Sequence, residues 1–154
     1  MIIYRIFNTN NVINALEKES IIRFLYKHLG EYGDSLADIQ KSIDFALKVS
    51  NPGLATISLG GFVLAAYEER EIIGAVVINR TGMSGYIPGH ILVYIAVHKD
   101  HRGKGLGKEL MQKVIDITKD DIALHVEPDN PAVNLYEKLG FENKYLEMRY
   151  SSAK

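Results

Sequence analysis

Residues 102–107 read Arg-Gly-Lys-Gly-Leu-Gly, four residues after the apolar stretch ILVYIAV at 91–97 and directly before a long amphipathic pattern. The β-branched, apolar run predicts a buried strand over 90–97. The pattern after the glycines predicts a helix over about 105–119. Backbone N–H groups at a helix N-terminus lack partners of their own, and the helix dipole adds partial positive charge there. The glycine turn therefore predicts a phosphate site.

Two common phosphate motifs do not fit this turn. The dinucleotide fingerprint requires a third glycine three residues after the second, and Lys108 stands there when the first two glycines of the turn are used. The P-loop requires a glycine where this chain has Arg102 and a hydroxyl where it has Glu109. The pattern that does fit is R-x-x-G-x-G, formed by Arg102, Gly105 and Gly107.

Two stretches resemble signatures of one family. The span VYIAVHKDHRGKGLGKELM, which begins at Val93, resembles the acyl-CoA-binding signature of the Gcn5-related N-acetyltransferases. The span VEPDNPAVNLYEKLGF at 126–141 resembles a second signature of that family. Together they cover about residues 90–141. The resemblance implies acetyl-CoA, that is acylated coenzyme A, as co-substrate and no metal.

The resemblance also implies which residues hold coenzyme A. Successive backbone N–H groups of the turn are expected to converge on the pyrophosphate, namely those of Arg102, Gly103, Lys104, Gly105, Leu106 and Gly107. A Cβ at Gly105 or Gly107 would hold the backbone away from the phosphate oxygens. The backbone of Ile95 and Val97 is implied to pair with the pantetheine arm like an added strand, beside a gap that often accompanies a bulge.

Asn130 corresponds to an asparagine that lies close to the pantetheine in the family. The spacing is one residue shorter than a common form of the signature, which makes Asp129 the alternative position. Asn130 also stands before Pro131, an arrangement typical of a helix N-cap, and one side chain can serve both purposes. Lys138 is either a cofactor contact or an exposed helix lysine.

Tyr136, in the context NLYEKLGF, is the predicted catalytic residue. When an amine attacks a thioester, the leaving group is a thiolate whose conjugate acid has a pKa near 8.5, like a cysteine. A phenol beside that sulfur can donate a proton or a hydrogen bond, and general acids contribute about 10²–10⁴-fold. The alternative is an aromatic side chain packed under the sheet.

No general base can be assigned from the sequence. Many family members place a carboxylate or histidine on the strand before the turn, where this chain has the apolar Ile91 and Val93. His90 and Tyr94 have the opposite strand parity and should point away unless a bulge intervenes. Deprotonation through ordered water, or through a group from another segment, is the working hypothesis. The other histidines are weaker candidates for the general base. His98 and His101 flank the turn, and His125 is interpreted as a structural histidine.

Composition limits the class of protein. The chain has 154 residues, 47% of them apolar, no cysteine and a net charge of −1, which indicates one ordinary domain over residues 1–154. This balance points to no nucleic-acid or membrane partner, and the missing signal-peptide pattern and missing cysteine are consistent with a cytoplasmic protein. Residues 98–119 nevertheless carry six basic side chains against three acidic ones.

The element order is predicted as β-α-α-β-β-β-α-β-α-β, a mixed, mostly antiparallel α/β sheet with helices on both faces. The strands are expected at 2–7, 62–67, 72–78, 90–97, 122–126 and 141–150. The helices are expected at 12–29, at 36–47 after a Ser35 cap, at 105–119 and at 131–139, before Gly140. The first helix should have one apolar face that includes Val12 and Leu16.

These inferences predict an N-acyltransferase that transfers acetyl directly to a primary amine without a covalent enzyme intermediate. The acceptor is open: an amine-bearing small molecule, a peptide or protein N-terminus, or a lysine. Glu31, Asp34 and Asp38 could attract a cationic amine, although a solvated loop explains them equally. Exposed strand edges make a homodimer reasonable. The alternative is a catalytically weak acyl-CoA-binding sensor or interaction module of the same fold.

Overall fold

The computed structural model describes residues 1–54 and 57–153, which form five strands, four α-helices and two short 3-10 turns. The strands are β1 (Ile2–Phe7), β2 (Gly61–Glu68), β3 (Glu71–Arg80), β4 (His90–Val97) and β5 (Ile122–Leu124). The helices are α1 (Ala15–Leu29), α2 (Leu36–Leu47), α3 (Leu106–Thr118) and α4 (Ala132–Lys138). The 3-10 turns are η1 (Gly30–Tyr32) and η2 (Lys99–His101).

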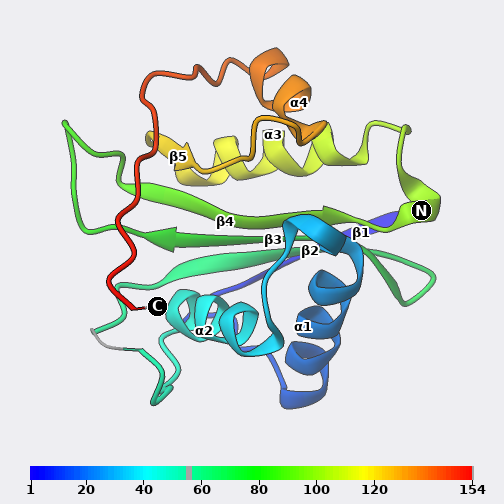
Figure 1. The fold of residues 1–154 in the computed structure, drawn as a ribbon. Coiled ribbons are helices and arrows are strands. Elements are labelled where there is room, and N and C mark those ends of the chain that lie inside the picture. The colour runs from blue at the N-terminus through cyan, green and yellow to red at the C-terminus, as the bar shows by residue number, and fades with distance from the viewer. Residues whose placement is uncertain (55–56, 154) are drawn as a thin grey trace.

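The strands form one sheet in the order β1-β2-β3-β4-β5. The first three neighbouring pairs are antiparallel, and β5 lies parallel to β4 after the α3 crossover. Figure 1 shows α1 and α2 on one face of the sheet and α3 and α4 on the other. The predicted fold class, a mixed and mostly antiparallel sheet with helices on both faces, is confirmed.

The core consists of two apolar clusters, one on each face. The first joins α1 and α2 to the sheet through side chains such as Ile21, Leu25 and Ile43. The second joins α3 and α4 to the opposite face through side chains such as Leu110 and Tyr136. Because neighbouring residues of a strand point to opposite faces, these two clusters show the side on which each sheet residue lies.

Helix starts follow local capping rules. The Asn14 side chain accepts a hydrogen bond from the N–H of Glu17 at 2.8 Å, so α1 begins at Ala15 and not at residue 12. Ser35 caps α2 in the same way, as predicted, at 3.1 Å from the N–H of Asp38. The expected apolar face of the first helix is wrong at its beginning, since Val12 is 80% and Leu16 84% exposed.

The strand predicted at 141–150 is also wrong. This segment is irregular in the structure, and Figure 1 shows it running from α4 past the ends of the strands toward α2. Its large apolar side chains Tyr145, Leu146, Met148 and Tyr150 are exposed. Alternating apolar residues report a preference for a pleated surface and do not supply the neighbouring edge that a strand needs. The nearest edge belongs to β5, which has only three residues.

Candidate acyl-CoA and acceptor site

The glycine turn presents free backbone donors at the start of α3. Gly103 and Gly105 have φ angles of +76° and +83°, a region that disfavours side chains, and a Cβ at either position would meet no atom within 4 Å. Gly105 caps the helix without a side chain, and the first helical bond runs from the N–H of Glu109 to the oxygen of Gly105 at 3.0 Å. The three N–H groups of Leu106, Gly107 and Lys108 therefore have no acceptor among the described residues.

Gly107 differs from the other two glycines of the turn. A Cβ there would lie 3.3 Å from Cδ2 of Leu135 and 3.8 Å from Cγ2 of Val97. The missing side chain at Gly107 thus allows α4 to pack closely on the first turn of α3. This packing brings the second signature, on α4, next to the first.

The strands β4 and β5 pair only over their first three residues, from His90 with Ile122 to Leu92 with Leu124. Beyond Leu92 the outer edge of β4 has no strand partner among the described residues. The N–H of His98 bonds to the oxygen of Ile73 in β3 at 2.8 Å. Because bonding direction alternates along an antiparallel pair, the polar backbone groups of Ile95 and Val97 face the free edge.

A bulge in β4 changes the face on which Tyr94 lies. Val77 of β3 pairs with Tyr94 whereas the next residue, Ile78, pairs with Leu92, so Val93 is an extra residue. Leu92 consequently belongs to the cluster under α3, and Tyr94 belongs to the cluster under α1 and α2. Simple alternation would have placed Tyr94 with Leu92, and the bulge is what overrides it.

Tyr94 is tied to the connection between α1 and α2. Its hydroxyl donates to Oδ2 of Asp34 at 2.5 Å, and burial together with this hydrogen bond raises the pKa of Tyr94 well above its ordinary value. In the same connection, the hydroxyl of Tyr32 donates to the backbone oxygen of Asp129 at 3.3 Å. The α1–α2 connection therefore touches β4 on one side of the gap and the segment before α4 on the other.

Tyr136 is buried on the inner side of α4. Its ring packs edge-on against Phe141 with 5.8 Å between ring centroids, and burial raises its pKa to about 12. Its hydroxyl has no hydrogen-bond partner in the described part of the chain. The ring of Tyr136 packs in the core, as the alternative interpretation expected. Because its hydroxyl is unpaired, the role of Tyr136 as a hydrogen-bond donor stays a prediction.

Asn130 caps α4. Its side-chain oxygen accepts a hydrogen bond from the N–H of Ala132 at 2.9 Å, which agrees with the capping interpretation. The amide nitrogen is not used by this cap. A contact between Asn130 and the pantetheine stays a prediction. Asp129, the alternative position, is exposed, and its backbone holds Tyr32. Lys138 is exposed at the end of α4.

The Arg102 side chain points back to the protein. Its Nε donates to the oxygen of Val97 at 3.2 Å, and its guanidinium also donates to the oxygen of His28 at 2.8 Å. Arg102 thus connects the end of α1 to the end of β4. In this arrangement its backbone, rather than its guanidinium, is available at the turn.

The histidines that flank the turn serve packing. His28 lies under His98 with 4.4 Å between ring centroids, and His98 packs edge-on against His101. His101 is also paired with Glu68 through Nε2 at 3.2 Å. No group of three or more histidine or acidic side chains in residues 1–54 and 57–153 is arranged to hold a metal ion.

His90 and His125 lie in different places. His90, at the far end of β4 from the turn, contacts Oδ2 of Asp120 at 3.1 Å. His125 follows the last pair of β4 and β5 and is exposed. Its neighbours Leu124 and Val126 pack toward α3, so alternation directs His125 to the face on which Tyr94 lies. The sequence suggested a structural role for His125, because the sequence pattern does not show that β4 and β5 stop pairing just before this residue.

The residues present fit coenzyme A. Unpaired N–H groups at the end of a helix suit a pyrophosphate, and the free edge of β4 suits the two amides of a pantetheine arm. Tyr136 belongs to the apolar cluster on one face of the sheet, and Tyr94 belongs to the cluster on the other face.

Comparisons with known families agree with this fit. The family described as "Acetyltransferase (GNAT) family" matches residues 23–141. N-alpha-acetyltransferase 30 of Schizosaccharomyces pombe is 32% identical over 85 residues, which are 52% of this chain and 57% of that protein. The match thus spans little more than half the length of this curated relative.

Solved structures share the fold at low identity. A GNAT family acetyltransferase from Streptococcus pneumoniae TIGR4 superposes with a TM-score of 0.69 at 17% identity over 100% of both chains. A structure of the NatC complex bound to Gag peptide and CoA gives a TM-score of 0.66 at 22% identity, over 92% of this chain and 84% of that one. In the described part of the chain, no helix has the length and apolar character needed to cross a membrane.

Proposed function

Because the chain belongs to the GNAT acetyltransferase family, we propose that it transfers the acetyl group of acetyl-CoA directly to a primary amine. The observation that carries this proposal is the separation of β4 from β5 after Leu92, next to the unpaired N–H groups of α3. Acetyl-CoA supplies an activated thioester. The amine nitrogen bonds to the acetyl carbon as the C–S bond breaks and the thiolate of coenzyme A leaves. A single domain, a homodimer and a cytoplasmic location stay predictions from the sequence.

Tyr136 acts on the leaving sulfur. With its pKa near 12, the hydroxyl keeps its proton throughout the physiological range and is a donor at all times. Complete transfer of that proton to a thiolate with a conjugate pKa near 8.5 would cost roughly 5 kcal/mol. The role that fits this residue is therefore a hydrogen bond to the developing thiolate, in a site that excludes water.

The acceptor amine enters from the face covered by α1 and α2. Tyr94, bonded to Asp34, lies on that face. Alternation with Leu124 and Val126 directs the exposed His125 to the same face. We assign His125 as the group that takes the amine proton, directly or through water. Ile91 and Val93 of β4 offer no side chain for this purpose, so the proposed base comes from the segment that follows β5.

We propose the α-amine of a peptide as the acceptor. An α-amine with a pKa near 8 costs about 1.4 kcal/mol to deprotonate at pH 7, whereas a lysine amine near 10.4 costs about 4.6 kcal/mol. A site with a single exposed histidine suits the first better. The acidic side chains Glu31, Asp34, Glu127 and Asp129, which flank the gap, suit a cationic group on approach. The relatives compared above include N-alpha-acetyltransferase 30.

The test is thiol release from acetyl-CoA in the presence of an amine panel. We expect turnover with a peptide that has a free N-terminus and no lysine. We expect little with the same peptide when its N-terminus is blocked and one lysine is added. Thermal stabilisation by acetyl-CoA without turnover on any amine would favour the alternative of a catalytically weak sensor. Absence of stabilisation by acetyl-CoA would contradict the site itself.

A further inference from the structure

A groove of the protein lies outside the gap between β4 and β5. It is an open groove of about 850 Å³ between one side of α1 and the end of the sheet that carries the β2–β3 turn. We call it the α1 groove and define it by the side chains that matter below: Leu16, Arg23, Phe24, Lys27, Arg70 and Ile72. His98, at the end of β4, marks its boundary toward the glycine turn.

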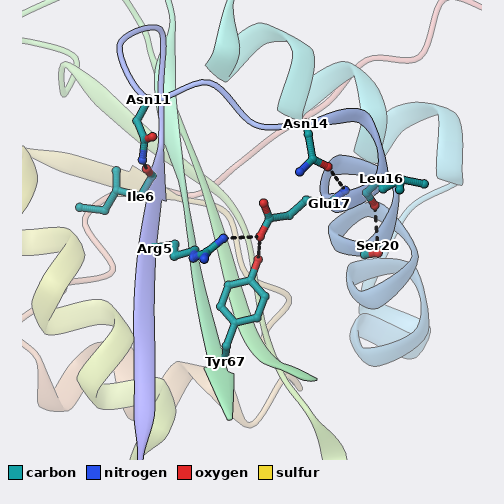
Figure 2. A network of polar contacts seen from close by, with 8 residues as sticks. All are labelled: Arg5, Ile6, Asn11, Asn14, Leu16, Glu17, Ser20 and Tyr67. Carbon is teal, nitrogen blue, oxygen red and sulfur yellow. Dashed lines mark hydrogen bonds and ion pairs between the residues drawn. The ribbon is translucent and has the colours of Figure 1, made fainter. Parts of the chain in front are cut away.

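The floor of the α1 groove is held in place by a polar network. Figure 2 shows Arg5 from β1 and Tyr67 from β2 meeting Glu17 from the first turn of α1. The Glu17 carboxylate accepts from Arg5 at 3.3 Å and from the Tyr67 hydroxyl at 2.6 Å. The charge of Glu17 is therefore already satisfied within the protein.

The rim of the groove is basic. Lys27 and Arg70 are both exposed and have no carboxylate partner among the described residues, and Arg23 pairs only with Glu19 on its own helix at 2.8 Å. Glu71 is the one other acidic residue of the lining besides Glu17. Two cations at the rim are thus free to meet a ligand that carries negative charge.

The position of Arg70 costs backbone energy. Glu69 and Arg70 form the tight turn between β2 and β3 with φ angles of +50° and +72°. Asparagine and glycine are preferred in such turns because other side chains disfavour positive φ. Strained backbone of this kind concentrates at functional sites, and here it holds an arginine at the groove.

Apolar surface lies along the same groove. Leu16, which is 84% exposed, lines the groove together with Phe24 and Ile72. Large exposed apolar side chains next to unpaired cations are typical of protein-binding surfaces. Such a surface would explain why Leu16, which the apolar pattern predicted to be buried, is exposed instead.

We propose that the α1 groove binds an extended polypeptide segment that carries both carboxylates and apolar side chains. Carboxylates of the segment pair with Lys27 and Arg70, and apolar side chains pack on Leu16, Phe24 and Ile72. An open, elongated surface suits an extended chain better than a small metabolite, which proteins usually enclose. Nucleic acid fits less well, because Glu71 faces the groove and apolar side chains form its edge.

The experiment measures binding of a fluorescein-labelled peptide of alternating glutamate and leucine to the full chain by fluorescence anisotropy. We expect micromolar affinity that weakens as salt is raised. The double variant Lys27→Glu/Arg70→Glu should bind at least about tenfold more weakly, because attraction becomes repulsion at two positions. The matched control is Lys144→Glu/Arg149→Glu, the same charge change in the exposed C-terminal segment, which Figure 1 places at the other end of the sheet.

Two further probes make the outcome decisive. Replacing each glutamate of the peptide by glutamine, or each leucine by serine, should weaken binding to the wild-type chain. Equal affinity for the wild type and both double variants, or no binding at all, would overturn the proposal. Tighter binding of a single-stranded RNA of the same length, lost in the groove variant, would assign the surface to nucleic acid instead. Thiol release with a small amine should stay unchanged in the groove variant, so that this result is independent of the acetyl-transfer proposal.

Discussion

At the scale of single residues, the chemistry depends on hydroxyl and imidazole groups whose surroundings differ. Tyr136 is buried and has no partner for its hydroxyl in the described part of the chain, whereas Tyr94 is buried and bonded to Asp34. The Tyr136 hydroxyl has no protein partner to exchange among the described residues, and we propose that it donates a hydrogen bond to the substrate.

Replacing Tyr136 by Phe removes only this hydroxyl. We expect kcat to fall about 10- to 100-fold, with the KM for acetyl-CoA nearly unchanged, because the hydrogen bond forms mainly as the thiolate develops. Steady-state thiol release measures both constants. Because the pKa of Tyr136 is about 12, the wild type should not lose activity near pH 10 through this group. An alkaline decline at pH 10 that disappears in the variant would contradict the assignment.

His125 and His90 form a matched pair for the acceptor side. We expect His125→Ala to lower kcat/KM for a peptide α-amine about 100-fold at neutral pH. His90→Ala should leave kcat/KM unchanged, because His90 contacts Asp120 at the far end of β4. A loss of activity in His90→Ala, or full activity in His125→Ala, would place the base elsewhere.

At the scale of elements, the site is made by two departures from regular structure. The extra residue Val93 in β4 moves Tyr94 to the face covered by α1 and α2, and Gly105 caps α3 without a side chain, which leaves three N–H groups of α3 unpaired. Both departures require the surrounding sheet to hold them. A regular strand and a side-chain-capped helix would have closed the site.

Gly105→Ala tests the turn, with Gly85→Ala as its control. Both glycines have φ near +80°, and a Cβ at either would meet nothing within 4 Å, so each variant should lose about 1 kcal/mol of stability. Only Gly105→Ala should also weaken the binding of acetyl-CoA, because only that glycine belongs to the turn proposed to hold the pyrophosphate. Denaturant unfolding and calorimetric titration give the two quantities. Equal acetyl-CoA affinity in both variants would remove the turn from the site.

At the scale of the whole molecule, the burial of one histidine, His28, makes stability depend on pH. Burial lowers the pKa of His28 to about 4, and His98, Lys27, Arg102 and Lys99 add to the effect. The unfolded chain, with an ordinary pKa near 6.5, binds a proton first as the pH falls. The free energy of unfolding should therefore decrease as the pH falls from 6.5 to 4. Below pH 4, His28 should cause no further decrease.

His28→Phe keeps a ring between Phe24 and His98 and removes the titrating group. We expect the melting temperature of the wild type to fall more steeply than that of the variant between pH 6.5 and 4. Melting curves at several pH values in this interval measure the difference. Parallel curves for the two proteins would show that His28 is not the responsible group.

Local rules allowed much of the fold to be predicted. The bounds of β1 and β4 agree with the expected strands, and Ser35 and Asn130 cap their helices as expected. Each depends on residues within one or two turns of chain. The strand expected at 141–150 failed because pairing needs a partner edge. The helical pattern also failed at Val12 and Leu16, which are exposed because none of the described elements covers these side chains.

The sequence by itself determined the glycine turn, the strand before it and the helix after it, because backbone freedom and apolar periodicity act over a few residues. Only the tertiary structure decided on which face Tyr94 lies, because a single bulged residue in β4 reverses strand parity. It likewise decided that Arg102 holds α1 to β4, and that residues 70 positions apart or more meet across the sheet. Such contacts depend on distances in space that no local pattern of residues records.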